Sequence, residues 1–459
     1  MSPTSSLFLL AETREHPMHV GGLELFQPPE GADSRDVMKL FEPLIEDAEV
    51  APVFQKRARR SVTSLGQWGW EVDKRFDIEH HVRKNALPHP ARVRELLTLC
   101  SRLHSTLLDR HRPLWEMHLI EGLDDGRFAV YTKTHHALLD GVSALRVLSR
   151  MLSDDPDERD MPAPWAPRTL TKTRKADGGH AGLDPARAVR EAFSMAADVA
   201  GLAPALARTV GRALNEQGGN MSFAAPRTML NVPVTGARRF AAQSWPIDRI
   251  RQVGKAADTT VNDVVLTMCS GALRSYLQSQ DALPETPLIA MVPVSLHGED
   301  TGHGDGGGNN VGAVMCNLGT HLDDPVERLA TVHQSMLDGK ESMRGMSQLQ
   351  TLVMSAIGVS PLGIYPLLRL DGKARPPFNL VISNVPGPRS PMYWNGSRLD
   401  GLYPLSVVLD GQALNITVTS YSDEIAFGLT GCRRSVPHLQ RLLTHLDDEL
   451  VALERAVGV

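Results

Sequence analysis

The chain has only four cysteines among its 459 residues, and they lie far apart: Cys100, Cys269, Cys316 and Cys432. No Cys-x-x-Cys pair is present, so the sequence indicates neither a disulfide framework nor a zinc ribbon. Scattered single cysteines of this kind are typical of a protein in the reducing cytoplasm, which is where we expect this chain.

The sequence also lacks an excess of positive charge. Its 48 Lys and Arg residues are outnumbered by 53 Asp and Glu, which gives a formal net charge of −5. Nucleic-acid-binding proteins normally have a net basic balance, so no nucleic-acid partner is expected. A hydrophobic content of 42% and a charged content of 22% are ordinary for a soluble globular protein, and the length predicts two domains.

Long uninterrupted apolar runs are missing as well. Residues 1–10 have no basic region, and their apolar run is too short for a signal peptide. Residues 345–368 carry no charge, but Gly358, Pro361 and Pro366 interrupt them, which argues against a continuous transmembrane helix. The segment is expected to form either a buried helix pair or a lipid-facing wall of an acyl tunnel.

Hydrophobic periodicity predicts strands and helices in both parts of the chain. Strands are expected at residues 18–26, 115–120, 128–134, 240–246, 288–294, 311–318, 380–384, 413–420 and 425–430. Helices are expected at residues 40–45, 93–108, 142–152, 186–214, 260–277, 326–337 and 437–457. This mixture predicts an α/β or α+β sandwich.

One segment differs in composition from the rest. Residues 153–185 are rich in Asp, Pro, Lys, Thr and Gly and show little periodicity, which predicts an exposed linker. The linker would separate an N-terminal half, residues 1–152, from a C-terminal half, residues 186–459.

The most informative motif is His135-His136-Ala137-Leu138-Leu139-Asp140-Gly141, which falls between a predicted strand and a predicted helix. Loops at such positions hold reactive groups on a rigid frame. A histidine is the usual group for taking a proton from an alcohol near neutral pH, so the motif predicts ester formation. Neighbouring side chains on a strand point to opposite faces. One histidine would therefore reach the hydroxyl of the alcohol, and the other would pack in the core or orient the first histidine.

The remaining polar residue of the motif leaves two roles open. Asp140 either polarises the imidazole of His136 or makes a buried ion pair that holds the loop. Gly141 is expected to allow a close backbone approach at the helix entry. No further ligand completes a metal site with His136 and Asp140, so no metal is expected. No Ser or Cys stands in a GxSxG elbow, so no covalent acyl-enzyme is indicated.

Several other segments, taken in order, resemble the bacterial wax ester synthase/acyl-CoA:diacylglycerol acyltransferase (WS/DGAT) family. Besides HHxxxDG, the similar segments are Met18-His19-Val20-Gly21, Pro113-Leu114-Trp115, Asn262-Asp263, Met291-Val292-Pro293-Val294-Ser295, Gly308-Asn309-Asn310-Val311-Gly312 and Asn384-Val385-Pro386-Gly387-Pro388. The resemblance covers essentially the whole chain. It implies two chloramphenicol-acetyltransferase-like halves with an active site in a tunnel between them.

The resemblance also implies the chemistry. His136 would be the base, acyl-CoA the donor as a co-substrate with no other cofactor, and diacylglycerol or a long-chain fatty alcohol the acceptor. Because the product is insoluble, we expect peripheral contact with the inner membrane or with lipid inclusions.

The other motif residues have structural alternatives. Asn262 and Asp263 begin a helix, where Asn262 either caps the helix or has a direct role in the site. Pro113-Leu114-Trp115 is expected to pack at the start of a strand. Asn384 opens a segment with the composition of a turn, which would bridge the two halves.

Two other functions fit the same motif. HHxxxDG is shared by a wider superfamily, so the acyl donor could instead be bound to a carrier protein. A non-catalytic lipid-inclusion protein with a decayed site is the second alternative, although the intact motif argues against decay.

Overall fold

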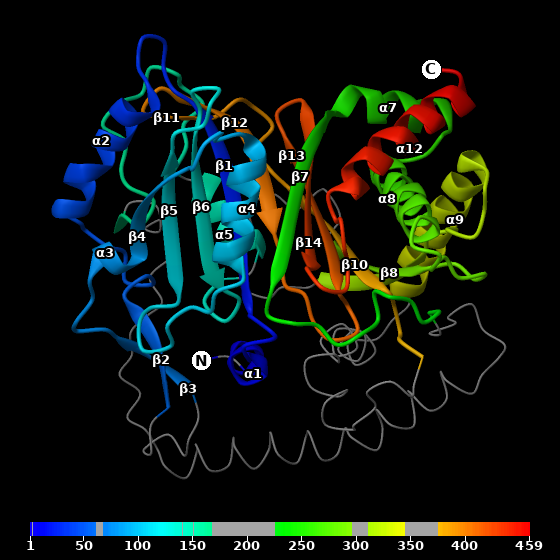
Figure 1. Cartoon of the computed structure of the whole chain (residues 1–459), viewed down its shortest axis with the longest axis horizontal. Helices are drawn as coiled ribbons and strands as arrows, with labels where there is room; N and C mark the ends of the chain where they lie inside the picture. Colours follow the sequence, from blue (N-terminus) through cyan, green and yellow to red (C-terminus); the bar gives the residue numbers. More distant parts are fainter. Residues whose placement is uncertain are drawn as a thin grey trace.

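Two six-stranded sheets form the centre of the molecule (Figure 1). The computed structural model describes residues 1, 3–60, 68–139, 141–149, 151–167, 225–295, 311–344 and 375–459. Strands and helices are mixed in both halves, so the predicted α/β class is confirmed. Asp140, the predicted helix at residues 186–214 and the apolar segment at residues 345–368 lie outside the described residues.

The first sheet has the strand order β11-β12-β1-β6-β5-β4. Its strands are β1 (His19–Gln27), β4 (Val82–Ala86), β5 (Trp115–Glu121), β6 (Phe128–His135), β11 (Tyr393–Trp394) and β12 (Ser397–Leu405). β11 and β12 come from the C-terminal part of the sequence, so the boundary expected at residue 152 does not separate the two sheets. β12 pairs with β1 and thereby covers backbone groups that would otherwise form a free edge.

The second sheet has the order β7-β14-β13-β10-β8-β9. Its strands are β7 (Arg238–Pro246), β8 (Ile289–Ser295), β9 (Val311–Asn317), β10 (Leu380–Pro386), β13 (Leu414–Tyr421) and β14 (Glu424–Cys432). Four helices lie on its side away from the first sheet (Figure 1): α7 (Ile247–Ala256), α8 (Val261–Gln278), α9 (Pro325–Arg344) and α12 (Arg441–Val457). Their apolar faces and this sheet form the largest core cluster, which explains why α8 is buried along most of its length.

The described helices of the N-terminal half are α1 (Pro3–Ala11), α2 (Ser34–Glu46), α3 (Ile78–His81), α4 (Val93–His104) and α5 (Gly141–Ser149). β2 (Lys56–Arg60) and β3 (Trp68–Val72) pair antiparallel in a separate two-stranded sheet. α4 lies between the two sheets (Figure 1). It ends at His104 rather than at residue 108, because the N–H of Ser105 bonds to the carbonyl of Arg102 in a tighter turn.

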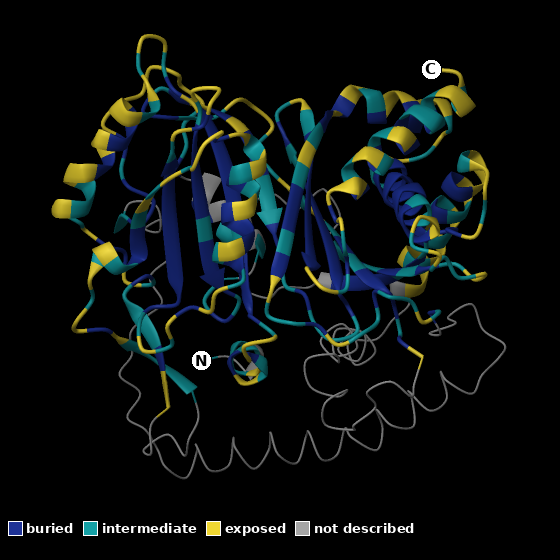
Figure 2. Cartoon of the chain, viewed as in Figure 1, coloured by how far each residue is buried: buried dark blue, intermediate teal, exposed yellow. Residues whose placement is uncertain are grey.

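Strand β1 has two different faces because its side chains alternate. Leu23 and Leu25 pack with Leu96 of α4 in one core cluster. Phe26 packs in the other cluster, with Phe128 of β6. Figure 2 shows that the strands of both sheets are largely buried, whereas exposed residues gather on the outer helices.

The described part of the predicted linker, residues 153–167, is not exposed throughout. Met161 is 6% exposed and Trp165 is 1% exposed, and both belong to the core cluster around Phe41. The carbonyl of Trp165 also accepts a hydrogen bond from the N–H of Ala51 at 2.8 Å. Residues 154–160 are exposed, as predicted. Burial of the large indole outweighs the polar composition of the neighbouring residues, so the prediction of an exposed linker was wrong for residues 161–165.

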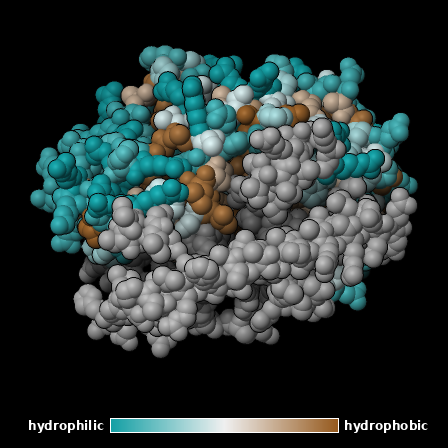
Figure 3. All heavy atoms as spheres, turned by 90° about the horizontal axis from the view of Figure 1, so that it is seen from below, coloured by the Kyte–Doolittle hydropathy of each residue, from teal (hydrophilic) through white to brown (hydrophobic). Residues whose placement is uncertain are grey.

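None of the helices in the described ranges has the length and apolarity needed to cross a bilayer. Seen from below, the described surface is mostly hydrophilic, and apolar side chains show in a few small areas (Figure 3).

Candidate active site

The HHxxxDG motif lies where β6 ends and α5 begins. His135 is the last residue of β6 and pairs with His19, the first residue of β1. The N–H of His135 bonds to the carbonyl of Leu114 at 3.0 Å, and the N–H of His136 bonds to the carbonyl of Met18 at 2.8 Å. The backbone of both histidines is thus fixed by neighbouring segments of the first sheet.

The two histidine rings have different surroundings. His135 is fully buried, and its Nδ1 accepts a hydrogen bond from the N–H of Ala137 at 3.0 Å. His136 is half-buried, and its ring stacks on Phe8 with 4.1 Å between centroids and 16° between planes. The two rings thus differ in exposure, and the role of one of them in contacting a substrate stays a prediction.

Glu12 explains how the buried ring is held. Its Oε1 lies 3.4 Å from Nε2 of His135, and its Oε2 accepts from Nε of Arg110 at 2.7 Å. Burial alone would raise the pKa of Glu12, but the hydrogen bonds and charges of His135 and Arg110 bring the pKa below its ordinary value. Because Nδ1 of His135 is an acceptor, the hydrogen-bond pattern assigns the ring proton to Nε2, facing this carboxylate.

A layer of buried polar groups lies beneath the motif on the first sheet. Nε2 of His19 bonds to the carbonyl of His104 at 2.8 Å, and Nδ1 of His104 contacts the hydroxyl of Tyr131 at 2.9 Å. Burial lowers the pKa of His19 well below its ordinary value and lowers that of His104 to about 3. Both rings are therefore neutral near pH 7, and they support the strand ends without adding charge.

The Pro113-Leu114-Trp115 segment packs, as expected. Leu114 and Trp115 are 0% and 4% exposed, and Pro113 is buried beside them. The indole N–H of Trp115 donates to the carbonyl of Phe54 at 2.8 Å. This segment fixes the start of β5, and through the carbonyl of Leu114 it also fixes the backbone of His135.

The Asn-Asp motif begins α8 in the C-terminal half. Thr260 is the N-cap of the helix, and its backbone N–H donates to Oδ2 of Asp263 at 3.0 Å. This bond completes a capping box. Of the two alternatives for Asn262, the cap is excluded, because Thr260, two residues earlier, is the N-cap, and the direct role in the site stays a prediction. Asp263 is 2% exposed and lies 2.8 Å from Nδ1 of His333 on α9.

Asn262 instead faces the next motif. Its Oδ1 lies 3.5 Å from Nδ2 of Asn384. Asn384 is exposed and belongs to β10 rather than to a turn, because β10 continues its parallel pairing with β13 as far as Pro386. The fold thus brings the two C-terminal motifs together, whereas His135 and His136 lie at the end of β6 in the first sheet.

Two site residues have no signal in the local sequence. Glu12 and Phe8 reach the histidines because α1 and the residue after it lie beside the end of β6. Glu12 is a single acidic residue directly after an apolar helix, which is a common pattern and predicts no particular contact. Its contact with His135 is therefore seen only in the tertiary structure. Asp140 lies outside the described residues, and Gly141 is the first residue of α5.

Potential metal ligands are not clustered in the described ranges: no group of three or more His, Cys, Asp or Glu side chains there is arranged around a common point.

Comparison with known proteins identifies the family. The profile described as the wax ester synthase/diacylglycerol acyltransferase catalytic domain matches residues 1–265, and the WS/DGAT C-terminal domain matches residues 307–454. The chain belongs to the WS/DGAT family. It is therefore an acyltransferase, and the order of motifs in the sequence predicted this family correctly.

Individual relatives agree with this assignment. A probable diacylglycerol O-acyltransferase of Mycobacterium tuberculosis H37Rv is 52% identical over 459 residues, which cover 100% of this chain and 99% of the relative. The wax ester synthase/diacylglycerol acyltransferase of Marinobacter aquaeolei VT8 is 43% identical, with a TM-score of 0.80 and 100% of both chains covered.

More distant structures share the WS/DGAT fold. The starter condensation domain of rhizomide synthetase matches with a TM-score of 0.53 over 100% of this chain and 94% of that domain, at 12% identity. This confirms the predicted relationship to the condensation and chloramphenicol-acetyltransferase-like fold.

Proposed function

We propose that this chain transfers an acyl group from acyl-CoA to the hydroxyl of diacylglycerol or of a long-chain fatty alcohol, with His136 as the general base. The observation that carries the proposal is the contrast between the two histidines. His135 is buried and held by Glu12, whereas His136 is half-buried at the strand end beside Phe8. The substrate classes come from the names of the 52% and 43% identical relatives.

The reaction needs one proton to move twice. A ring nitrogen of His136 takes the proton of the acceptor hydroxyl while its oxygen attacks the thioester carbonyl. The tetrahedral intermediate then collapses, the carbon–sulfur bond breaks, and the imidazolium returns the proton to the CoA thiolate. General-base help of this kind is worth about 10²- to 10⁴-fold in rate.

Direct transfer without an acyl-enzyme is part of the proposal. All four cysteines are buried, so none offers an accessible thiol nucleophile. The sequence has no serine in a GxSxG elbow. No cofactor is needed, because acyl-CoA already carries an activated acyl group.

The test uses purified protein, radiolabelled hexadecanoyl-CoA and, in separate tubes, diacylglycerol or hexadecanol. We expect labelled triacylglycerol or wax ester from the wild type and a loss of 10²-fold or more in His136→Ala. His111→Ala is the matched control, because the His111 side chain is 94% exposed. Full turnover by a folded His136→Ala protein would exclude His136 as the base.

The same assay separates the alternatives. Turnover with acyl-carrier protein but not with acyl-CoA would favour the carrier-protein donor, and lipid binding without turnover would favour an inclusion protein.

We also propose that the enzyme binds peripherally to membranes or lipid inclusions, because its product must enter a lipid phase. Co-flotation with vesicles that contain diacylglycerol tests this, and protein left at the bottom of the gradient would contradict it.

A further inference from the structure

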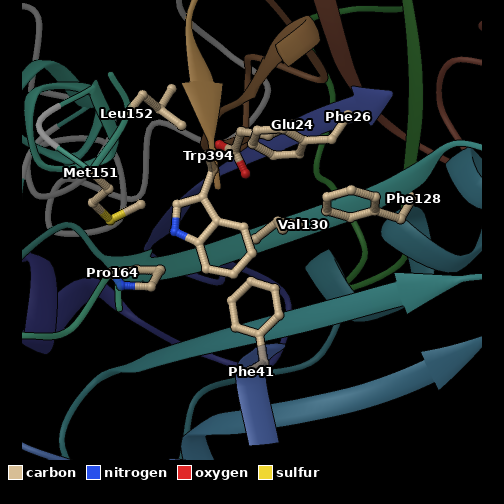
Figure 4. Close-up of a pocket in the computed structure, with 9 residues that line it drawn as sticks. All are labelled: Glu24, Phe26, Phe41, Phe128, Val130, Met151, Leu152, Pro164 and Trp394. Atoms are coloured by element: carbon tan, nitrogen blue, oxygen red, sulfur yellow. The ribbon is translucent and has the colours of Figure 1, made fainter. Parts of the chain in front are cut away.

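The cavity on the first sheet is part of the core and has no room for a substrate (Figure 4). Its space is little more than that of a water molecule, and its walls are apolar except for Glu24, which is 3% exposed. Phe41 stacks on Trp394 there with 4.2 Å between ring centroids. Positive charge, which an acidic ligand needs, is concentrated instead on β2, where four of the five residues are basic.

β2 and β3 form an antiparallel ribbon with two different faces. Ala58 stands opposite Trp70, and Arg57 stands opposite Glu71. Directly opposite residues share a face, whereas neighbours along a strand do not. One face of the ribbon therefore carries Ala58 and Trp70, and the other carries Arg57, Arg59 and Glu71.

The apolar face of the ribbon packs beside the HHxxxDG motif. Ala58 belongs to the core cluster that contains Ala137, the residue after His136, and Trp70 packs against the same cluster. Phe8, which stacks on His136, also packs there. In Figure 1, β2, β3 and α1 all lie at the lower end of the first sheet. The ribbon is thus anchored near the motif, and its charged face points away from this cluster.

Two guanidinium groups on the charged face share a single carboxylate. Nη1 of Arg59 lies 2.8 and 2.9 Å from the two carboxyl oxygens of Glu71, and Nη2 of Arg57 lies 3.5 Å from one of them. One carboxylate neutralises only one of these charges, and Lys56 and Arg60 add two more to the ribbon. The side chain of Arg59 is 59% exposed, so an anion from solvent can reach it.

The charged face also connects to the motif through the loop after α4. Nη1 of Arg57 donates to the carbonyl of His111 at 3.2 Å. The preceding residue, Arg110, contacts Glu12, whose carboxylate lies 3.4 Å from Nε2 of His135. The two arginines of the charged face are therefore near the motif, as the phosphates of an acyl-CoA with its thioester at the motif require.

The chemistry of the charged face favours the phosphates of a soluble donor over a lipid surface. Guanidinium groups bind phosphate oxygens through pairs of parallel hydrogen bonds. Binding at a membrane interface usually adds Trp or Tyr side chains to the basic ones. Trp68 and Trp70, however, pack against the core cluster on the other face. The charged face thus presents guanidinium groups without an aromatic anchor.

We propose that Arg57 and Arg59 bind the phosphate groups of the CoA moiety of the acyl donor. A diphosphate carries more negative charge than one carboxylate, so it replaces Glu71 as the partner of the two guanidinium groups. The inference rests on the proposed function in taking acyl-CoA as the donor, and it adds where the nucleotide end of that donor is held.

The test compares two donors, hexadecanoyl-CoA and S-hexadecanoyl-pantetheine, which has the same thioester but no phosphate. Arg57→Gln/Arg59→Gln should raise KM for hexadecanoyl-CoA about tenfold with kcat nearly unchanged, because contacts to a charged group are lost that do not change during the reaction. KM for S-hexadecanoyl-pantetheine should stay at the wild-type value. Glu71→Gln removes the competing carboxylate and should lower KM for hexadecanoyl-CoA.

Arg251→Gln/Lys255→Gln is the matched control, because it removes the same charge from α7 at the other end of the molecule (Figure 1). Arg251 is 57% exposed and pairs with the carboxylate of Asp248, much as Arg59 pairs with Glu71. We expect the control to keep the wild-type KM for both donors. A rise in the control as large as that in the arginine variant would mean that net charge alone attracts the donor.

An equal rise in KM for both donors, or no rise for hexadecanoyl-CoA in a folded Arg57→Gln/Arg59→Gln protein, would overturn the proposal. So would a KM for hexadecanoyl-CoA that rises as much in Glu71→Gln, since the ion pair itself would then be what matters. Loss of flotation with phosphatidylglycerol vesicles at an unchanged KM would assign the charged face to lipid headgroups instead.

If neither donor gives an ester, the proposed function fails, and calorimetry with CoA alone decides about the site. A Kd for CoA that is about tenfold higher in the arginine variant than in the wild type and the control supports the site. An equal Kd in all three proteins, or no binding of CoA to the wild type, overturns it.

Discussion

The carboxylate of Glu12 lies 3.4 Å from Nε2 of His135, and the backbone of His135 continues directly into His136. Arg110 holds the other oxygen of Glu12 at 2.7 Å, and the N–H of Met18 donates to Oε1 at 3.3 Å. The buried carboxylate of Glu12 therefore connects α1, the loop after α4 and the end of β6 at the motif.

Glu12→Gln tests whether this pair positions the base. The amide keeps the shape of the side chain but has no negative charge and only one acceptor oxygen, so either Arg110 or His135 loses its acceptor. We expect kcat to fall on the order of 10- to 100-fold, as for a slightly misplaced catalytic group, with KM nearly unchanged. Steady-state kinetics with hexadecanoyl-CoA measure this. A change in KM alone, or no change in kcat, would contradict a positioning role.

Phe8 is expected to orient the ring of His136. The stacked pair is worth about 0.5–1.5 kcal/mol, and Phe8→Leu removes the stacking but keeps an apolar side chain. We expect kcat to fall about 2- to 13-fold, the rate equivalent of that energy. Leu7→Ala is the control, because Leu7 is 48% exposed. Equal kcat values for the two variants would exclude a role for the stacked ring.

The local part of the site could be predicted from the sequence. An alternating strand, two histidines and an apolar helix follow one another from residue 128 to residue 149, so short-range patterns place His136 at a strand end. The resemblance of the motifs to the WS/DGAT family predicted a fold with two halves. The contact of Glu12 with His135 depends on how α1 docks, and no local pattern encodes that docking.

Other features of the fold were not predicted from the sequence because they depend on contacts between residues far apart in the chain. Nothing in residues 397–405 indicates that β12 joins β1, because the pattern of a strand predicts which face is buried but not which distant strand it pairs with. Pro386 and Gly387 have the composition of a turn, yet β10 extends to Pro386 because Pro386 stands opposite Ser420 of β13. Trp165 lies in a polar segment but is buried, because a single large side chain can fill a core site.

Glu24 should make the stability of the fold depend on pH. Its pKa of about 8 in the folded chain lies above the ordinary value of 4.5. Below pH 4.5 both the folded and the unfolded chain hold the proton. Between pH 4.5 and 8 the unfolded chain releases it first, so the free energy of unfolding falls by up to about 1.4 kcal/mol per pH unit.

Glu24→Gln cannot ionise and should remove this slope. We expect the variant to gain stability relative to the wild type as the pH rises from 5 to 8, measured by denaturant unfolding at each pH. A difference between the two proteins that stays constant over this range would show that Glu24 is already ionised in the fold.

At Gly428 the backbone of the second sheet lies close to the backbone of the first sheet. A Cβ at this position of β14 would lie 1.9 Å from the carbonyl oxygen of Pro404 on β12. The neighbouring contacts are polar: the N–H of Ser406 donates to Oγ1 of Thr430 at 3.2 Å, and the hydroxyls of Ser244 and Tyr403 lie 3.3 Å apart. The first sheet thus contacts the second through β12, the strand that pairs with β1.

Gly428→Ala should therefore separate the sheets as well as strain β14. Backbone cannot move aside as a flexible side chain can, so we expect a loss of about 1–3 kcal/mol and a lower Tm by calorimetry. Activity should also fall, because the His136 motif and the Asn262–Asn384 pair stand in different halves. Gly69→Ala is the matched strand control, since its nearest neighbour would lie 4.0 Å away. If Gly428→Ala and Gly69→Ala lowered Tm and activity by the same small amount, the close contact between β12 and β14 would not be needed to hold the two halves together.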